Sequence, residues 1–141
     1  MTKTQITQLS YDIVGCAIKV HKELGPGLLE SVYEMCLAYE LREKGFLVNQ
    51  QISTKISYGK IEIETPLKVD LLVNDSIIIE IKTVESLLPV HQAQLMTYMK
   101  ILKKPQGLLI NFYTDNITKS MISLINEYFS NSRNNILFKL S

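Results

Sequence analysis

The chain has 141 residues, 46% of them hydrophobic and 21% charged, which is the balance of an ordinary globular protein. The formal net charge of +1 argues neither for nor against nucleic-acid binding, but without a clearly basic domain any such binding should rely on a local patch. No apolar run reaches the roughly 20 residues of a membrane span, and the first ten residues are too polar for a signal peptide. We therefore expect one cytoplasmic domain over residues 1–141, with no membrane partner.

Two helices are predicted in the first third of the chain. Apolar residues recur every three or four positions over residues 6–24, and the sequence Gly-Pro-Gly at residues 25–27 ends this helix. A second helix is predicted over about residues 28–44, with Gly45 at the position of a C-terminal cap. Cys16 and Cys36 lie among the apolar residues of these helices, without metal-site spacing, so we expect two reduced core cysteines.

The middle of the chain changes to the two-residue period of strands. Residues 52–58 and 61–63 alternate between apolar and polar side chains around a turn at Gly59, which predicts a hairpin that Pro66 ends or marks as an edge. The next elements are predicted in chain order: strands at residues 68–73 and 77–82, a helix at 91–103 and a strand at 108–113.

The last part of the chain has a mixed signal. Residues 117–129 fit a strand, a helix, or one followed by the other. A turn at residues 130–135 and a last strand at 136–140 complete the expectation. A helix between the last paired strands implies the α/β class, with a central mixed β-sheet flanked by helices.

Charged side chains interrupt the two apolar strands at residues 68–73 and 77–82. Glu80 and Lys82 point to the same face of their strand. If residues 74–76 form a three-residue loop, Asp70 lies directly opposite Glu80, whereas a two-residue loop would place them on opposite faces. The register is therefore a test of this pairing.

Two facing carboxylates repel each other, and a divalent cation relieves that repulsion. Oxygen ligands of this kind suit Mg²⁺ or Mn²⁺. Lys82 could then orient an attacking water or stabilise charge on a phosphate. The competing interpretation is that the E-x-K sequence of Glu80 and Lys82 lies on a solvated strand face, with an ion pair to the neighbouring strand.

Two further pairs share a helix face. Gln94 and Tyr98 are four residues apart, on a face different from the core stripe of that helix, and Glu30 and Tyr33 are three apart. Ordinary helix surface explains the first pair, and an exposed carboxylate with a half-buried tyrosine explains the second, so both alternatives remain open.

In combination these motifs resemble a known group of proteins. Residues 27–33 read GLLESVY, which matches the signature of the GxxExxY family in the PD-(D/E)xK nuclease superfamily. The resemblance extends over about residues 13–113 and includes HKELGPG at 21–27, VDL at 69–71, IEIK at 79–82 and HQAQLMTY at 91–98. The sequence departs from the superfamily name in one respect, since Lys68 and Val69 precede Asp70 where the name has a proline.

The resemblance implies a restriction-endonuclease-like core and a set of site residues. Gln94 and Tyr98 match the Q-x3-Y motif of RecB-like nucleases. The implied metal ligands are Asp70, Glu80, Glu30 and the Ile81 carbonyl. The implied catalytic residues are Asp70, Glu80, Lys82, Glu30, Gln94 and Tyr98.

Three functions are compatible with these residues. The leading hypothesis is a Mg²⁺-dependent (or Mn²⁺-dependent) nuclease that hydrolyses phosphodiester bonds in DNA, with a homodimer as a possible assembly. The alternative is a catalytically silent module that binds nucleic acid or protein and retains the nuclease fold. A metal-dependent hydrolase of another phosphate ester is the third. We expect His21 and His91 to be structural or surface residues rather than ligands.

Overall fold

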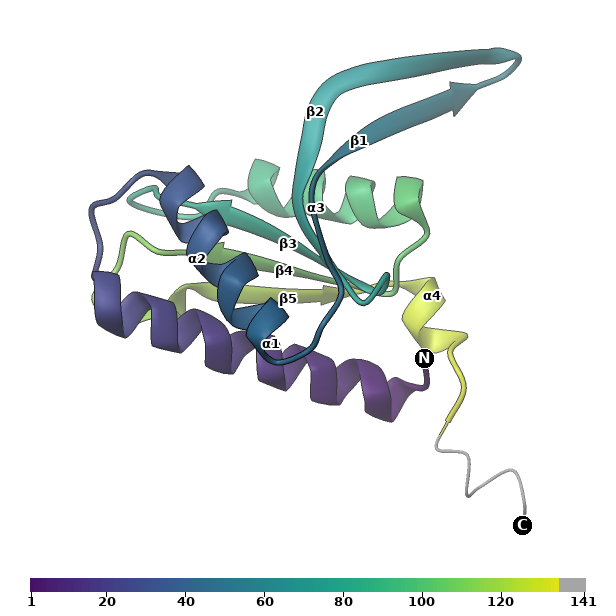
Figure 1. The fold of residues 1–141 in the computed structure, drawn as a ribbon. Helices are drawn as coiled ribbons and strands as arrows, with labels where there is room; N and C mark the ends of the chain where they lie inside the picture. The colour runs from purple at the N-terminus through teal and green to yellow at the C-terminus, as the bar shows by residue number, and fades with distance from the viewer. Residues whose placement is uncertain (135–141) are drawn as a thin grey trace.

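A computed structural model of the chain describes residues 1–134 (Figure 1). Its elements are, in chain order, α1 (Lys3–Leu24), α2 (Glu30–Glu43), β1 (Val48–Tyr58), β2 (Ile61–Val73), β3 (Ile77–Lys82), α3 (Pro89–Leu102), β4 (Gln106–Asn111), the 3-10 helix η1 (Ile117–Ser120), β5 (Met121–Ile125) and α4 (Glu127–Ser130).

The strands form one mixed sheet with the order β1-β2-β3-β4-β5. Only β3 and β4 run parallel, and α3 connects them, while every other neighbouring pair is antiparallel. This confirms the predicted α/β class and the central mixed sheet flanked by helices. Because the helix between β3 and β4 must leave the sheet and return, the chain passes over one face of the sheet at this point.

The helices cover both faces of the sheet (Figure 1). On one face α1 and α2 pack on alternate strand residues such as Leu71, Ile79 and Ile110. On the other face α3 packs on the intervening residues, which include Ile78 and Leu109. Successive strand residues thus point to opposite faces of the sheet and belong to two separate apolar clusters.

The helix ends follow their local sequence. Thr2 and Gln5 form a reciprocal capping box at the start of α1, and Gly25 ends this helix with a φ of 66°. Pro89 opens α3, where the missing backbone N–H costs nothing. The predicted helices are therefore confirmed, with α3 beginning and ending slightly earlier than expected.

The β1–β2 hairpin is much longer than the sequence predicted. Its outer part projects beyond the sheet as a two-stranded ribbon, which we call the arm (residues 54–67; Figure 1). Pro66 does not end β2; it lies at an irregularity where the register shifts between Ser53 and Lys55. Here β2 has only β1 as a neighbour, and a proline is tolerated because no third strand needs its N–H.

The region that the sequence left ambiguous contains a strand followed by a short helix. The 3-10 helix η1 leads into β5, which pairs antiparallel with β4, and α4 follows. The predicted last strand at residues 136–140 lies outside the described residues. Within residues 1–134 no helix is both long and apolar enough to cross a membrane.

Candidate metal site

Asp70 and Glu80 meet where the β2–β3 ladder ends. Val73 pairs with Ile77, so residues 74–76 form the three-residue loop on which the predicted pairing depends. Backbone pairing between β2 and β3 ends at Leu71 and Ile79. At the next position the side chains of Asp70 and Glu80 accept hydrogen bonds from backbone N–H groups of the opposite strand.

The two carboxylates are fixed by backbone donors of the opposite strand. The Asp70 N–H donates to Glu80 Oε1 at 3.1 Å, and the Ile81 N–H donates to Asp70 Oδ2 at 2.8 Å. Asp70 is half-buried and Glu80 is only 7% exposed. Each acid therefore has one oxygen held by the sheet and others available for a further partner.

The electrostatics of this pair are unfavourable without a cation. Burial, followed by the charge of Asp70, raises the pKa of Glu80 to about 8, although the Asp70 N–H and Lys82 act in the opposite direction. Burial also raises the pKa of Asp70, opposed by the Ile81 N–H and increased by Glu34 and Glu30. A divalent cation would remove this cost, because it favours both ionised forms.

Lys82 lies at the end of β3, on the same face as Glu80 and half-buried. The loop that follows is held by Asn111, whose Oδ1 accepts from the Val84 N–H and whose Nδ2 donates to the Val84 carbonyl at 2.7 Å. The Phe112 N–H donates to the Lys82 carbonyl at 2.9 Å. The backbone of Lys82 is thus fixed on both sides beside the carboxylate pair.

Glu30 is the first residue of α2, and its exposed side chain lies close enough to raise the pKa of Asp70 and Glu80. The hydrogen bonds of Tyr33 explain why Glu30 lies near the carboxylate pair. The Tyr33 hydroxyl donates to the Gly25 carbonyl at 2.5 Å and accepts from the Leu28 N–H at 3.2 Å. This ties down the loop before α2 and so sets where the helix begins.

Tyr33 is fully buried, not half-buried as one interpretation of the sequence had it. Its ring stacks on Phe112, with the ring centres 4.4 Å apart. In the segment GLLESVY, the tyrosine is thus a structural anchor for the loop, while the glutamate one turn earlier is presented at the surface.

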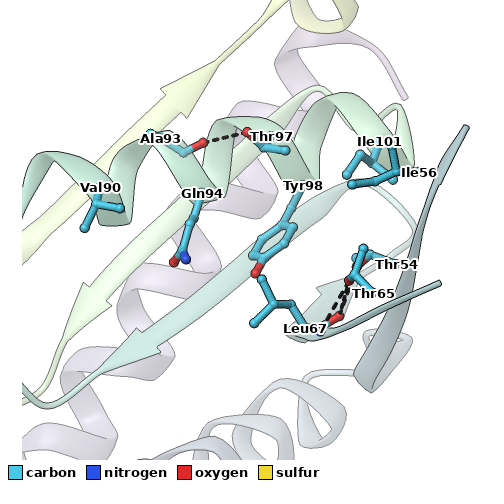
Figure 2. A pocket seen from close by; sticks show the side chains of 10 residues that line it. All are labelled: Thr54, Ile56, Thr65, Leu67, Val90, Ala93, Gln94, Thr97, Tyr98 and Ile101. Carbon is cyan, nitrogen blue, oxygen red and sulfur yellow. Dashed lines mark hydrogen bonds between the residues drawn. The ribbon is translucent and has the colours of Figure 1, made fainter. Parts of the chain in front are cut away.

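Gln94 and Tyr98 both line an apolar groove between α3 and the arm (Figure 2). The sequence placed Tyr98 on a face separate from the core stripe, and this is wrong: Tyr98 is 6% exposed and belongs to the cluster of Leu95 and Met99. At about 100° per residue, Tyr98 lies only about 60° from Leu95 around the helix, so the sheet covers both.

The same burial brings Tyr98 near the carboxylate pair. Burial raises the pKa of its phenol, and the charges of Glu80 and Asp70 raise it further. In Figure 2 the Tyr98 ring crosses the groove toward Leu67, and Gln94 projects from the preceding turn. Both side chains therefore line the α3 side of the groove, and Tyr98 is also close enough to the carboxylates to respond to their charge.

Three residues that the sequence did not single out form a hydrogen-bonded group next to Asp70: Glu34, Gln50 and Gln51. Glu34 is one turn beyond Glu30 on α2 and is 9% exposed. Its two oxygens accept from Gln50 Nε2 at 3.0 Å and from Gln51 Nε2 at 2.5 Å, and Gln51 Nε2 also lies 3.3 Å from Asp70 Oδ1. The only sequence signal was the four-residue spacing of the two glutamates.

The two histidines have structural partners. His21 Nε2 donates to the Thr114 carbonyl at 2.8 Å, which links the end of α1 to the loop after β4. His91 Nδ1 accepts from the Leu88 N–H at 3.0 Å at the start of α3. Both bonds agree with the expected structural roles.

The protein side chains at this site supply only some of the oxygen ligands that a hard divalent cation needs. Asp70 and Glu80 offer carboxylate oxygens, which Mg²⁺ and Mn²⁺ prefer. Within residues 1–134, however, no three His, Cys, Asp or Glu side chains are grouped as a metal site. Glu30 is thus near but not part of a completed cluster, and water or substrate oxygens would have to supply the remaining ligands.

A mixed β-sheet with helices on both faces is the architecture of the restriction-endonuclease-like fold. The chain belongs to the PD-(D/E)XK nuclease superfamily, whose model matches residues 7–124. Nucleases of this superfamily generally use divalent metal ions.

One solved structure shows the same fold. The chain is 22% identical to the protein in the structure titled "Crystal structure of SSO0001", with a TM-score of 0.55. The match covers 68% of this chain and 49% of the other, so the chain spans about half the length of that protein. No curated protein matches the chain.

Proposed function

We propose that this protein is a Mg²⁺-dependent nuclease that hydrolyses phosphodiester bonds in DNA. The observation that carries the proposal is the pair formed by the half-buried Asp70 and the buried Glu80, which face each other across the end of the β2–β3 ladder with Lys82 beside them. Membership in the nuclease superfamily supports the same conclusion.

In this proposal Asp70, Glu80 and the Ile81 carbonyl hold the cation, and Glu30 approaches it from the start of α2. When bound, the cation lowers the pKa of a coordinated water and polarises the phosphodiester. The Lys82 ammonium orients the water or stabilises negative charge on the phosphate. Mn²⁺ would serve the same oxygen donors.

The finer family assignment belongs to the proposal as well. The GxxExxY signature accounts for Glu30 and Tyr33, and the Q-x3-Y motif accounts for Gln94 and Tyr98. The apolar groove beside these last two residues offers room for the part of a substrate strand that adjoins the reacting phosphate. A cytoplasmic location and a homodimer complete the expectation.

A binding module without turnover is the second candidate. It is favoured by the net charge of +1, which gives the whole chain little attraction for the nucleic-acid backbone, and by the incomplete group of acidic metal ligands. In that case the carboxylate pair would remain as a feature of the fold, and nucleic acid or protein would bind without being cut.

The deciding experiment is cleavage of labelled duplex DNA, single-stranded DNA and RNA with Mg²⁺ or Mn²⁺. We expect the wild type to cut DNA, EDTA to abolish cutting, and Asp70→Asn and Glu80→Gln each to reduce it by two or more orders of magnitude. If wild type binds metal and nucleic acid but never cuts, the binding module is the better account. Cutting of RNA alone would overturn the DNA assignment.

A further inference from the structure

Gln51 has an unusual backbone for a residue inside a strand. Its φ is 53°, in the left-handed region that non-glycine residues rarely enter. It lies in β1 between Gln50, which pairs with Leu71, and Ile52, which pairs with Val69. Gln51 is therefore the residue next to Asp70 on the neighbouring strand.

The side-chain alternation of both strands is interrupted at this point. Val48 faces the α1–α2 cluster, whereas Ile52, four residues later, faces the α3 cluster. In β2, Val69 and Leu72 both face the α3 cluster although they are three residues apart. A period of two forbids both patterns, so the pleat shifts at Gln51 and at Asp70 together.

The shifted backbone lets one side chain reach two carboxylates. Gln51 Nε2 lies 2.5 Å from Glu34 Oε1 and 3.3 Å from Asp70 Oδ1. An amide nitrogen has two N–H groups, so each carboxylate receives one of them. Ionised carboxylates only accept hydrogen bonds, which requires the nitrogen, and not the oxygen, of the amide to face them.

We propose that Gln51 is the positioning residue that orients Asp70 for the cation, with the buried Glu34 as its anchor. This inference rests on the proposed metal site. With Gln51 on Oδ1 and the Ile81 N–H on Oδ2, both oxygens of Asp70 are fixed, and the plane of its carboxylate is set before a cation arrives. Asp70 itself remains the metal ligand, and Gln51 acts through it.

A glutamine suits this position better than a charged donor. A lysine would neutralise Glu34 and Asp70 and so reduce the attraction of the site for a cation. A neutral amide separates the two carboxylates and orients them while leaving their negative charge in place. Gln50 Nε2 binds the second oxygen of Glu34 at 3.0 Å, so Gln50 and Gln51 occupy separate oxygens of Glu34.

The chain offers a matched pair of variants. Gln51→Gly removes the side chain that binds both Glu34 and Asp70. Glycine adopts a φ of 53° without strain, so the substitution also relieves backbone strain. Gln51 is exposed, so its removal leaves no cavity in the core. Gln50→Ala removes the other donor to Glu34 without touching Asp70.

Mn²⁺ binding by calorimetry provides the first measurement, with melting temperature in EDTA as the control for folding. Partners that orient metal ligands typically contribute 10–100-fold to metal affinity. We expect Gln51→Gly to weaken Mn²⁺ binding at least about 10-fold at an unchanged or higher melting temperature, and Gln50→Ala to change it less than about 3-fold.

Amide hydrogen exchange of the metal-free protein provides the second measurement. If Gln51 orients Asp70, removing it should weaken the hydrogen bond between the Ile81 N–H and Asp70 Oδ2. The exchange rate of the Ile81 amide should then rise in Gln51→Gly, while the Ile79 amide stays protected. Unchanged exchange at Ile81, or equal losses of affinity in the two variants, would overturn the inference. Should the wild type not bind Mn²⁺, the proposed metal site fails, and the exchange at Ile81 alone decides whether Gln51 positions Asp70.

Discussion

At the scale of single residues, the fold holds two carboxylates close together, and a bound cation would relieve the free-energy cost of ionising both. Glu80 is only 7% exposed and faces Asp70, and the positive charge of Lys82 does not offset the effect of burial on its pKa. A solvated strand face does not explain this arrangement, because a solvated and ion-paired Glu80 would have a pKa at or below its ordinary value. The competing interpretation of the motif as a solvated strand face is therefore not supported.

The first prediction concerns pH. A folded-state pKa of about 8 for Glu80, against 4.5 ordinarily, means that the folded protein holds a proton that the unfolded chain releases between these values. The stability of the metal-free protein should therefore be greatest below about pH 4.5 as far as this group is concerned, and fall as pH rises through about 8. The raised pKa of Asp70 acts in the same direction.

Urea unfolding in EDTA at about pH 5 and about pH 9 measures this effect, which is on the order of a few kcal/mol. The matched variant is Glu80→Gln, which keeps an acceptor for the Asp70 N–H but cannot ionise. We expect this variant to lose most of the pH dependence in that interval. An equal decline in wild type and variant would contradict the assigned pKa.

Tyr33 carries a second prediction at this scale. Tyr33→Phe keeps the stack on Phe112 but leaves the Leu28 N–H and the Gly25 carbonyl without their partner. We expect a loss of about 1–3 kcal/mol in the free energy of unfolding, measured with urea. Tyr39→Phe, on the exposed face of α2, is the control and should change stability by less than about 0.5 kcal/mol.

The sequence predicted some of these residues and missed others for physical reasons. The facing of Asp70 and Glu80 followed from the two-residue period of the strands, provided that the loop has three residues. The sequence left that loop length open, and the register decides it. Gln51 and Glu34 were missed because their roles depend on a backbone conformation that glutamine rarely adopts and on a contact between distant elements. The burial of Tyr98 was misjudged because the apolar face of α3 is wider than its leucine and methionine stripe.

At the scale of elements, α3 and β4 approach each other unusually closely. A Cβ on Gly107 would lie 2.7 Å from Leu95 Cδ1 and 2.8 Å from Met99 Sδ. Gly107→Ala should therefore push α3 off the sheet and cost about 1–3 kcal/mol in thermal or urea unfolding. Gly15→Ala, in the exposed middle of α1 with no atom within 4 Å of the new Cβ, should instead stabilise by about 1 kcal/mol. Equal effects of the two substitutions would contradict this packing.

The arm is the least supported element of the sheet. Its outer strands pair only with each other and expose Ile56, Tyr58, Ile61 and Ile63, and a two-stranded ribbon is marginally stable by itself. We expect the amides of the arm to exchange with solvent much faster than those of Ile79 and Leu109. Protection that increases with protein concentration would show instead that a second copy covers the arm, as the expected homodimer would allow.

Element prediction succeeded where the pattern was regular. The helices and the central strands have strong periods, and they lie within a few residues of their predicted bounds. The arm was underestimated because Pro66 normally argues against a strand, whereas here it lies beside an irregularity with only one neighbouring strand. The segment after Thr114 could not be resolved because its strand and helix are each only a few residues long.

At the scale of the whole molecule, the site forms where the sheet divides. β1 and β2 leave the sheet to form the arm just where β3 ends with Glu80, Ile81 and Lys82 (Figure 1). The start of α2 approaches from one side, and α3 lines a groove with the arm on the other. In this position Asp70 is half-buried and Glu80 is only 7% exposed, and the sheet holds both carboxylates in place.

The most direct test of the nuclease account is metal-dependent cleavage of labelled DNA by wild type and Lys82→Ala, with Lys68→Ala as a control for the loss of one positive charge. Lys68 is exposed on β2 two residues before Asp70 and has no proposed part in the reaction. The account predicts that Lys82→Ala still binds Mn²⁺ but cuts at least about 100-fold more slowly, while Lys68→Ala cuts within a few-fold of wild type. Cleavage by Lys82→Ala at the wild-type rate would contradict it.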